Sequence, residues 1–413
     1  MSLEWFIGRR YLASRRGTRF LSLITLIAIG GVSVGVMALI VVTAVMTGLQ
    51  EDLRDKILGV NPHIWVMTYG EGMRMDDWQG ALTRVREVKD VAAAGPFIHT
   101  EVAIRNRAAY TEAAILRGID PYQPGPSVTG IGGTLRRHDM LPPRTRSGLP
   151  PVAIGEGLAG RASLLPGDTV VVISLQNVNV TAVGGLMPTI RKYEVTGTFR
   201  TGMYEYDNKF MYTTIPAAQE LTGIGRSVSG IEVRVPDPGN ATEVGERIVE
   251  KLGLPYRTDD WKTMNQALFS ALKLEKLAMS LILLLIVIVA AFNIVSTLVM
   301  VVTDKTREIG ILKSMGLTSR RVLRIFMIQG LVIGLVGSLA GAAGGLLLNY
   351  VIDRYQLIRI PGEIYFVTHL PVRSDPLDVV TIILATVLIS FVATIYPAIQ
   401  AARLTPVEAI RHE

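Results

Sequence analysis

The chain has 413 residues, 49% of them hydrophobic, and a formal net charge of +7. It contains no cysteine, which excludes a disulfide framework. Apolar residues gather in four long stretches, so the composition predicts an integral membrane protein with a large extramembrane part. The basic residues cluster beside these stretches, which indicates membrane topology rather than nucleic-acid binding.

The first 19 residues mix aromatic and aliphatic side chains with five arginines. This pattern predicts an interfacial amphipathic helix on the cytoplasmic side. The apolar stretch 20–49 that follows is too long for a signal-peptide core, which spans about 7–15 residues. We therefore expect residues 20–49 to form the first transmembrane helix.

Residues 50–275 alternate strand-like and helical patterns, which predicts an α+β domain outside the cytoplasm, in the periplasm of a Gram-negative cell. Helical patterns cover residues 78–88 and 241–252. Strand-like runs cover 152–173, 192–199 and 231–235, with Gly, Pro and Asp between them.

A hairpin is predicted near 177–191, because Gly184-Gly185 lies between two strand-like runs. Its tip is apolar: Val183, Leu186, Met187 and Pro188 have no evident core to enter, and Arg191 follows them. Exposed apolar tips mark interaction sites. A hairpin without a partner would explain the same pattern.

Three further apolar stretches, 276–302, 325–351 and 377–402, are each long enough to cross a bilayer, which takes about 20 residues. The loop 303–324 is rich in Lys and Arg and is therefore predicted to be cytoplasmic, as is the tail 403–413. Residues 352–376 then form a short periplasmic loop, and both termini lie in the cytoplasm.

The cytoplasmic loop reads T-D-K-T-R-E-I-G-I-L-K-S-M-G from Thr303 to Gly316. Asp304 or Glu308 suits the first turn of a helix. A single apolar stripe is expected from Ile309, Ile311, Leu312, Met315 and Leu317. Such a helix either rests on lipid headgroups or docks in a groove of a cytoplasmic partner.

The stretch 325–351 carries glycines at small-x-x-x-small spacing: Gly330, Gly334, Gly337, Gly341 and Gly345. In lipid this spacing lets helix backbones approach closely. Gln329 is expected to be the one polar side chain of this stretch that needs a partner.

The loop K-T-R-E-I-G-I-L-K-S-M-G resembles the signature of a permease superfamily. That superfamily includes the lipoprotein-releasing (Lol) permeases, the macrolide-efflux MacB type and the cell-division permease FtsX. Gly118-Ile-Asp-Pro121, Ile154-Gly-Glu-Gly-Leu-Ala159 and Pro166-Gly-Asp168 resemble its MacB-like periplasmic core. The hairpin looks like the hook of LolC-type subunits, so the LolC/LolE family is the nearest resemblance.

The resemblance implies three sites. The coupling site, which docks on an ATP-binding cassette (LolD-type) subunit, consists of Lys305, Thr306, Arg307, Glu308, Ile309, Gly310, Lys313, Met315 and Gly316. The hook, which binds the periplasmic chaperone (LolA-type), consists of Val183, Gly184, Gly185, Leu186, Met187, Pro188 and Arg191. A cavity for the acyl chains of a triacylated lipoprotein is bordered by Met46, Leu49, Tyr365 and Phe366.

No G-x-x-x-x-G-K-[ST] motif occurs, so the chain is expected not to be an enzyme. No metal or cofactor of its own is expected, and ATP and Mg would be held by the separate cassette subunit. The resemblance implies release of outer-membrane lipoproteins from the inner membrane, with a second permease subunit, identical or LolE-type. Two alternatives stay open: an efflux permease for another hydrophobic substrate, and an FtsX-like regulator of a periplasmic hydrolase.

Overall fold

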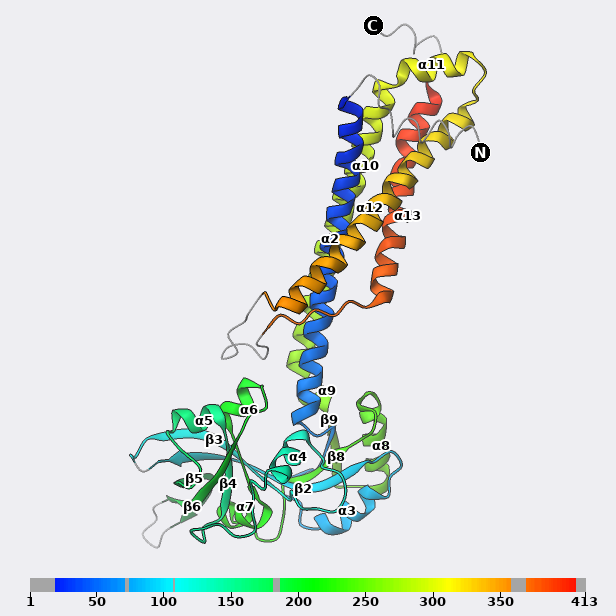
Figure 1. Cartoon of the computed structure of the whole chain (residues 1–413). Helices are drawn as coiled ribbons and strands as arrows, with labels where there is room; N and C mark the ends of the chain where they lie inside the picture. The colour runs from blue at the N-terminus through cyan, green and yellow to red at the C-terminus, as the bar shows by residue number, and fades with distance from the viewer. Residues whose placement is uncertain (1–18, 71–73, 107, 181–185, 358–368, 406–413) are drawn as a thin grey trace. The chain divides into compact units, whose positions relative to one another are not determined.

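The computed structural model describes residues 19–405 apart from 71–73, 107, 181–185 and 358–368. The chain divides into two compact units (Figure 1). One is helical, and the other combines strands and helices and is called the α/β unit here, although most of its strand pairings are antiparallel, as in an α+β fold. The α/β unit is built mainly from the residues between Asp52 and Ser270. Each unit is described by itself.

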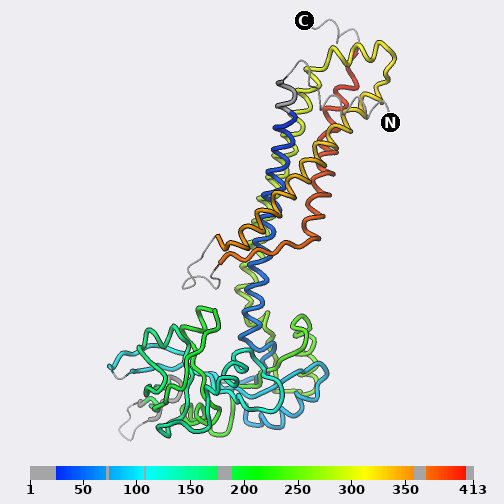
Figure 2. The backbone as a smooth tube through the Cα atoms, viewed as in Figure 1, coloured from blue at the N-terminus to red at the C-terminus, as the bar shows by residue number. Residues whose placement is uncertain are grey.

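The helical unit contains the long apolar helices. They are α2 (Arg19–Val60), α10 (Gln266–Asp304), α12 (Ser319–Tyr355) and α13 (Pro376–Arg403). Within the described residues, these four helices are long and apolar enough to cross a membrane. The short helix α11 (Thr306–Ser314) joins α10 to α12, as the backbone trace in Figure 2 makes clear.

The glycines of α12 bring its backbone against two neighbouring helices. A Cβ atom on Gly334 would lie 2.5 Å from Ser390 of α13, and Gly330 faces Thr394 on the same helix. Gly337, Gly341 and Gly345 face α2, at Val32, Ser33 with Val36, and Ile40 respectively. The prediction of close helix packing along this stripe is confirmed, and the stripe contacts two helices, α13 and α2.

Gln329 of α12 is 1% exposed, and its Oε1 accepts no hydrogen bond within the described part of the chain. The expectation that it is the one polar side chain of this helix needing a partner is wrong. Asn349 is also buried, and its Nδ2 donates to Ser374 Oγ at 2.9 Å.

The α/β unit is organised around one sheet of nine strands in the order β3-β7-β4-β6-β5-β2-β8-β1-β9. The strands are β1 (Ile64–Thr68), β2 (Ala93–Arg105), β3 (Thr111–Ile119), β4 (Pro151–Gly155), β5 (Thr169–Val180), β6 (Leu186–Phe199), β7 (Phe210–Thr214), β8 (Gly230–Arg234) and β9 (Tyr256–Asp260). The helices are α3 (Trp78–Arg86), α4 (Gly130–Arg137), α5 (Glu156–Arg161), α6 (Tyr204–Lys209), α7 (Ile215–Thr222), α8 (Ala241–Leu252) and α9 (Trp261–Met264), with the 3₁₀ turn η1 (Pro238–Asn240).

Strand β2 divides this unit into two lobes. Its second half pairs with β5 and also with β3, so β3, β7, β4, β6, β5 and β2 join in a closed ring. Its first half pairs with β8, β8 pairs with β1, and β1 pairs with β9. Each lobe has its own apolar core, one around Val233 and Ile248 and one around Val172 and Val195.

Helices α3 and α8 confirm the helical patterns predicted at 78–88 and 241–252. The interpretation of 152–173 as strand is wrong in its middle, where α5 separates β4 from β5. The motif Ile154-Gly-Glu-Gly is a strand-to-helix turn. A Cβ on Gly155 would collide with the backbone of Asp207, so this turn requires glycine.

A buried ion pair joins the two lobes across β2. Arg117 of β3 donates to the Glu232 carboxylate of β8, and both side chains are almost fully buried. The guanidinium also lies 5.4 Å from the ring centres of Trp65 and Phe97.

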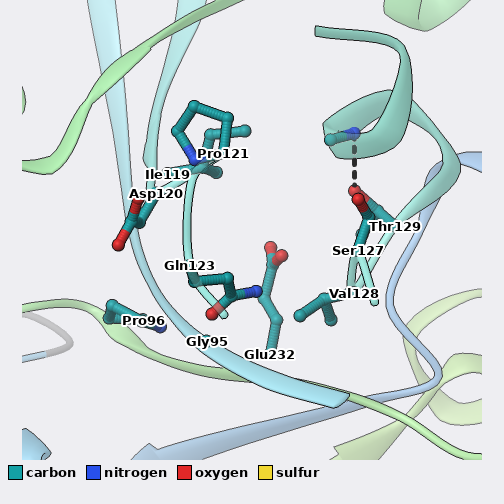
Figure 3. A pocket seen from close by; sticks show the side chains of 11 residues that line it. Gly95, Pro96, Ile119, Asp120, Pro121, Gln123, Ser127, Val128, Thr129 and Glu232 are labelled. Carbon is teal, nitrogen blue, oxygen red and sulfur yellow. Dashed lines mark hydrogen bonds between the residues drawn. The ribbon is translucent and has the colours of Figure 1, made fainter. Parts of the chain in front are cut away.

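Figure 3 shows the Glu232 side chain extending into a small pocket, opposite the Thr129 hydroxyl that accepts a hydrogen bond from the Gly132 amide. The pocket volume of about 20 Å³ is enough for one water molecule.

We expect acid to destabilise β2 through His99. Burial, with Arg117 nearby, lowers the pKa of His99 to about 4 from its usual 6.5. The unfolded chain therefore binds this proton more readily than the folded chain does. The contribution of neutral His99 to the free energy of unfolding is fully present above pH 6.5 and is lost as the pH falls toward 4. Linkage gives a loss of roughly 3 kcal/mol at pH 4.

Amide hydrogen exchange of β2 in the solubilised full-length chain, at pH 7 and near pH 4, measures this loss. The matched variant is His99→Gln, which stays neutral. Its opening free energy should depend less on pH than that of the original chain. Equal pH dependence in both proteins would contradict the assignment to His99.

Candidate functional site

Helix α11 carries most of the predicted coupling site and has two different faces. Glu308 lies in its first turn, as predicted, and Lys305 is its N-cap residue. The Lys305 ammonium pairs with the Glu308 carboxylate at 2.6 Å, and the Thr306 hydroxyl donates to the Val302 carbonyl at 2.9 Å. These contacts fix the entry from α10. Gly316 ends the segment with a φ of +98°, which favours glycine.

The inner face of α11 is fastened to the ends of its neighbours. Ile309 is 2% exposed and packs in a cluster with residues of the three adjoining helices: Val301 and Val302 of α10, Val322 and Phe326 of α12, and Ala398 and Ala401 of α13. This contact packs α11 against α10, α12 and α13 at one end of the helical bundle.

Lys313 adds a polar clamp to the same face. Its ammonium donates to the backbone carbonyls of Ala402 at 2.8 Å and Leu404 at 2.6 Å. The last carbonyls of a helix have no partner within the helix and carry partial negative charge, so a cation there is favourable. Lys313 therefore fastens α11 to the C-terminal end of α13.

The outer face of α11 presents Arg307, Glu308, Ile311 and Met315. Arg307, Ile311 and Met315 follow one another at four-residue spacing, which places them on one side of the helix. Ile311 is 45% exposed and Met315 is 79% exposed. The expected single apolar stripe is thus wrong: Ile309 and Leu317 pack inward, whereas Ile311 and Met315 face out.

Strands β5 and β6 place the predicted hook. They continue as a two-stranded ribbon after β5 leaves β2 at Ser174 and before β6 meets β4 at Glu194, in the pairings that the structure describes. Between the pairs Ile173–Ile190 and Val178–Pro188, β5 has more residues than β6, so the ribbon contains a bulge. A bulge bends and twists the ribbon at this point.

Of the hook residues, Pro188 and Arg191 are exposed, together with Ile190. Leu186 and Met187 begin β6, paired with Val180 and Asn179. Val183, Gly184 and Gly185 lie outside the described residues. The structure therefore places the base of the hook on a ribbon that extends from the ring of strands.

Of the four residues predicted to border the acyl-chain cavity, the structure describes two, Met46 and Leu49. Met46 and Leu49 are half-buried residues of α2, three positions apart and so on one face. Tyr365 and Phe366 lie outside the described residues. The structure also brings Pro371 and Arg373 against α2 at Gly48, a contact that the sequence did not indicate.

No group of three or more metal-ligating His, Asp or Glu side chains occurs in the described ranges. A hollow of about 810 Å³ in the α/β unit is lined by residues that include Pro96 of β2, Pro142, and Pro216 of α7.

The comparisons with known proteins cover both units. Residues 280–406 match the family model described as FtsX-like permease C-terminal, and residues 25–251 match the MacB-like periplasmic core domain. The lipoprotein-releasing system transmembrane protein LolC of Xylella fastidiosa is 35% identical over 417 residues, covering 98% of both chains. LolC of Neisseria meningitidis serogroup B is 35% identical over the whole of both chains. LolE of Haemophilus influenzae is 27% identical over 99% of both.

Proposed function

The chain belongs to the LolC/LolE family of lipoprotein-releasing transmembrane proteins, and from that premise we propose a function for it. It is the permease subunit of an ATP-driven inner-membrane complex. The complex extracts lipoproteins destined for the outer membrane and passes them to a periplasmic chaperone. Both termini are cytoplasmic, and the α/β unit with its hook lies in the periplasm.

The observation that carries the proposal is the two-faced helix α11. Its inner face is fastened to the bundle by Ile309 and Lys313, while its outer face leaves Ile311 and Met315 exposed. A helix that merely rested on headgroups would have no need of a clamp to the end of α13. A rigidly held helix with exposed apolar anchors and flanking charges suits docking into a groove of a cytoplasmic partner.

That partner is a separate cassette subunit that holds ATP and Mg. When two cassettes close on ATP, they move α11, and the clamp through Lys313 passes the movement to α13. The Ile309 cluster passes it to α10 and α12. The chain itself binds no nucleotide in this scheme; its part is to convert movement at one end of the bundle into movement of the spans.

The substrate explains why such a drive is required. Withdrawing acyl chains from a bilayer costs about 0.8 kcal/mol for each CH₂ group. An apolar receiving surface lowers the free energy of the extracted chains, and Met46 and Leu49 on α2 provide apolar side chains for it. A second permease subunit, a second copy or a LolE-type relative, completes the enclosure.

A photo-crosslinking residue at Met187 in intact cells tests the proposed function. We expect it to capture the periplasmic lipoprotein chaperone. Leu165, a 70% exposed apolar residue of the same unit outside the hook, is the matched control position and should capture none. Capture of a hydrolase regulator from Met187 would replace lipoprotein release with a signalling function, and capture of no protein would remove the hook from the proposal.

A further inference from the structure

We propose that residues 371–375, here called the strap, fix the rotation of α2 about its own axis, so that Met46 and Leu49 face the lipoprotein. Gly48 is the positioning residue that permits this contact. The inference deepens the proposed function and rests on it for the identity of the substrate. Its structural part concerns the helical unit alone.

The strap meets α2 through three contacts. The Arg373 amide donates to the Ala44 carbonyl at 2.9 Å. A Cβ on Gly48 would lie 2.5 Å from the Pro371 carbonyl oxygen and 3.0 Å from the Arg373 nitrogen, so the backbones touch here and only glycine fits. The Arg373 side chain pairs with Glu51 one turn further along.

The other contacts of the strap are with α12 and α13. Ser374 Oγ accepts a hydrogen bond from Asn349 Nδ2 of α12 at 2.9 Å. The Asp375 carboxylate accepts from the Leu377 amide at 2.9 Å and so caps the first turn of α13. Five consecutive residues therefore tie α2 to α12 and α13.

The strap also continues a contact that α12 begins. Gly337, Gly341 and Gly345 of α12 contact Val32, Val36 and Ile40 of α2. Ala44 and Gly48 extend the same four-residue spacing, which is one continuous stripe along a helix. The stripe is thus covered first by α12 and then, for two more turns, by the strap.

The contact with the strap determines which way the opposite side of α2 faces. With about 100° of rotation per residue, Met46 and Leu49 lie on the side of the helix opposite Ala44, Gly48 and Glu51. While the strap holds one side, the other side cannot turn toward α12. The strap therefore keeps Met46 and Leu49 on the side of α2 that the strap leaves uncovered, where the proposed lipoprotein contact lies.

The test is Gly48→Ala in the full-length chain, assembled with its partner subunits in membranes. The new methyl group would meet backbone atoms of the strap, which cannot rotate away, so the strap must move. Alanine favours a helix over glycine by about 1 kcal/mol, so α2 itself is not weakened. Gly30→Ala is the matched control, because it adds the same methyl group to α2 where no atom lies within 4 Å.

Two measurements are made. Because the chain has no cysteine, Met46→Cys introduces a single thiol, and its labelling rate reports which way this face of α2 points. Lipoprotein transfer to the chaperone reports function. We expect Gly48→Ala to change the labelling rate severalfold and to lower transfer about tenfold, while basal ATP hydrolysis and the amount of protein in the membrane stay unchanged. Gly30→Ala should change neither.

Unchanged labelling with Gly48→Ala would overturn the strap as a rotation lock, and changed labelling with normal transfer would overturn its role in release. If the unmodified chain transfers no lipoprotein, the proposed function fails, while the labelling experiment still decides whether the strap orients α2. If Gly48→Ala does not accumulate, Arg373→Glu takes its place: transfer must fall and be rescued by adding Glu51→Arg. Absence of rescue would overturn the proposal.

Discussion

Glu308→Lys should abolish stimulation of the partner ATPase by this chain, with a loss of about a hundredfold in coupled activity. Glu308 lies on the outer face of α11, in its first turn, beside Lys305. A lysine there removes the 2.6 Å ion pair, places two positive charges three residues apart and opposes the favoured charge at a helix N-terminus. It also reverses a charge next to the exposed anchors Ile311 and Met315.

The measurement is ATP hydrolysis by the reconstituted complex, with and without lipoprotein. The matched control is Asp304→Lys, which reverses the neighbouring carboxylate at the end of α10, before the helix that we propose to dock. We expect nearly normal stimulation from this control and normal membrane insertion from both variants. Normal stimulation by Glu308→Lys would contradict docking through the outer face of α11.

The sequence predicted the elements best where a single physical constraint acts along a whole segment. The apolar stretches predicted four membrane-length helices because a bilayer requires about 20 apolar residues in each. The spacing of Gly337, Gly341 and Gly345 predicted a close helix contact because small residues let helix backbones approach closely in lipid. It could not indicate which helix would fill the contact, and the answer is α2 for these three and α13 for Gly330 and Gly334.

The parts that the sequence did not predict depend on residues far apart in the chain. Lys313 is one of several bases in its loop, and only the fold brings the carbonyls of Ala402 and Leu404 to its ammonium. Ile309 and Ile311 look equivalent in sequence, yet one packs inward and the other is exposed. Glu232 reads as an ordinary polar residue of a strand, and its buried pairing with Arg117 follows from the way β2 joins two lobes.

The contact of Gly48 with the strap belongs to the same group. A lone glycine near the end of an apolar helix carries no pattern, and Pro371 lies more than 300 residues further along the chain. The helix α5 shows the opposite error. Its six residues are too few for a helical period to appear between two strands, so 152–173 was predicted as strand throughout.

Deleting residues 183–188 should remove capture of the periplasmic chaperone while leaving ATP hydrolysis intact. The deletion takes away the apolar tip and shortens a ribbon that, among the described pairings, is joined to the sheet only at its base. The ring of strands keeps its pairing through Ser174 and Glu194, so the α/β unit should still fold. Apolar anchors at the centre of an interface contribute at least about 2 kcal/mol each, so losing two lowers affinity by roughly a thousandfold.

Pull-down of the chaperone by the full complex measures this loss. A second variant, Leu186→Ser with Met187→Ser, keeps the length of the ribbon and separates the apolar contact from the shape of the hairpin. We expect it to lose most of the capture as well, whereas Leu165→Ser, an exposed apolar residue elsewhere on the unit, should lose none. Unchanged pull-down by the deletion would show that the chaperone binds another surface, and release of lipoprotein would then have to be assigned without the hook.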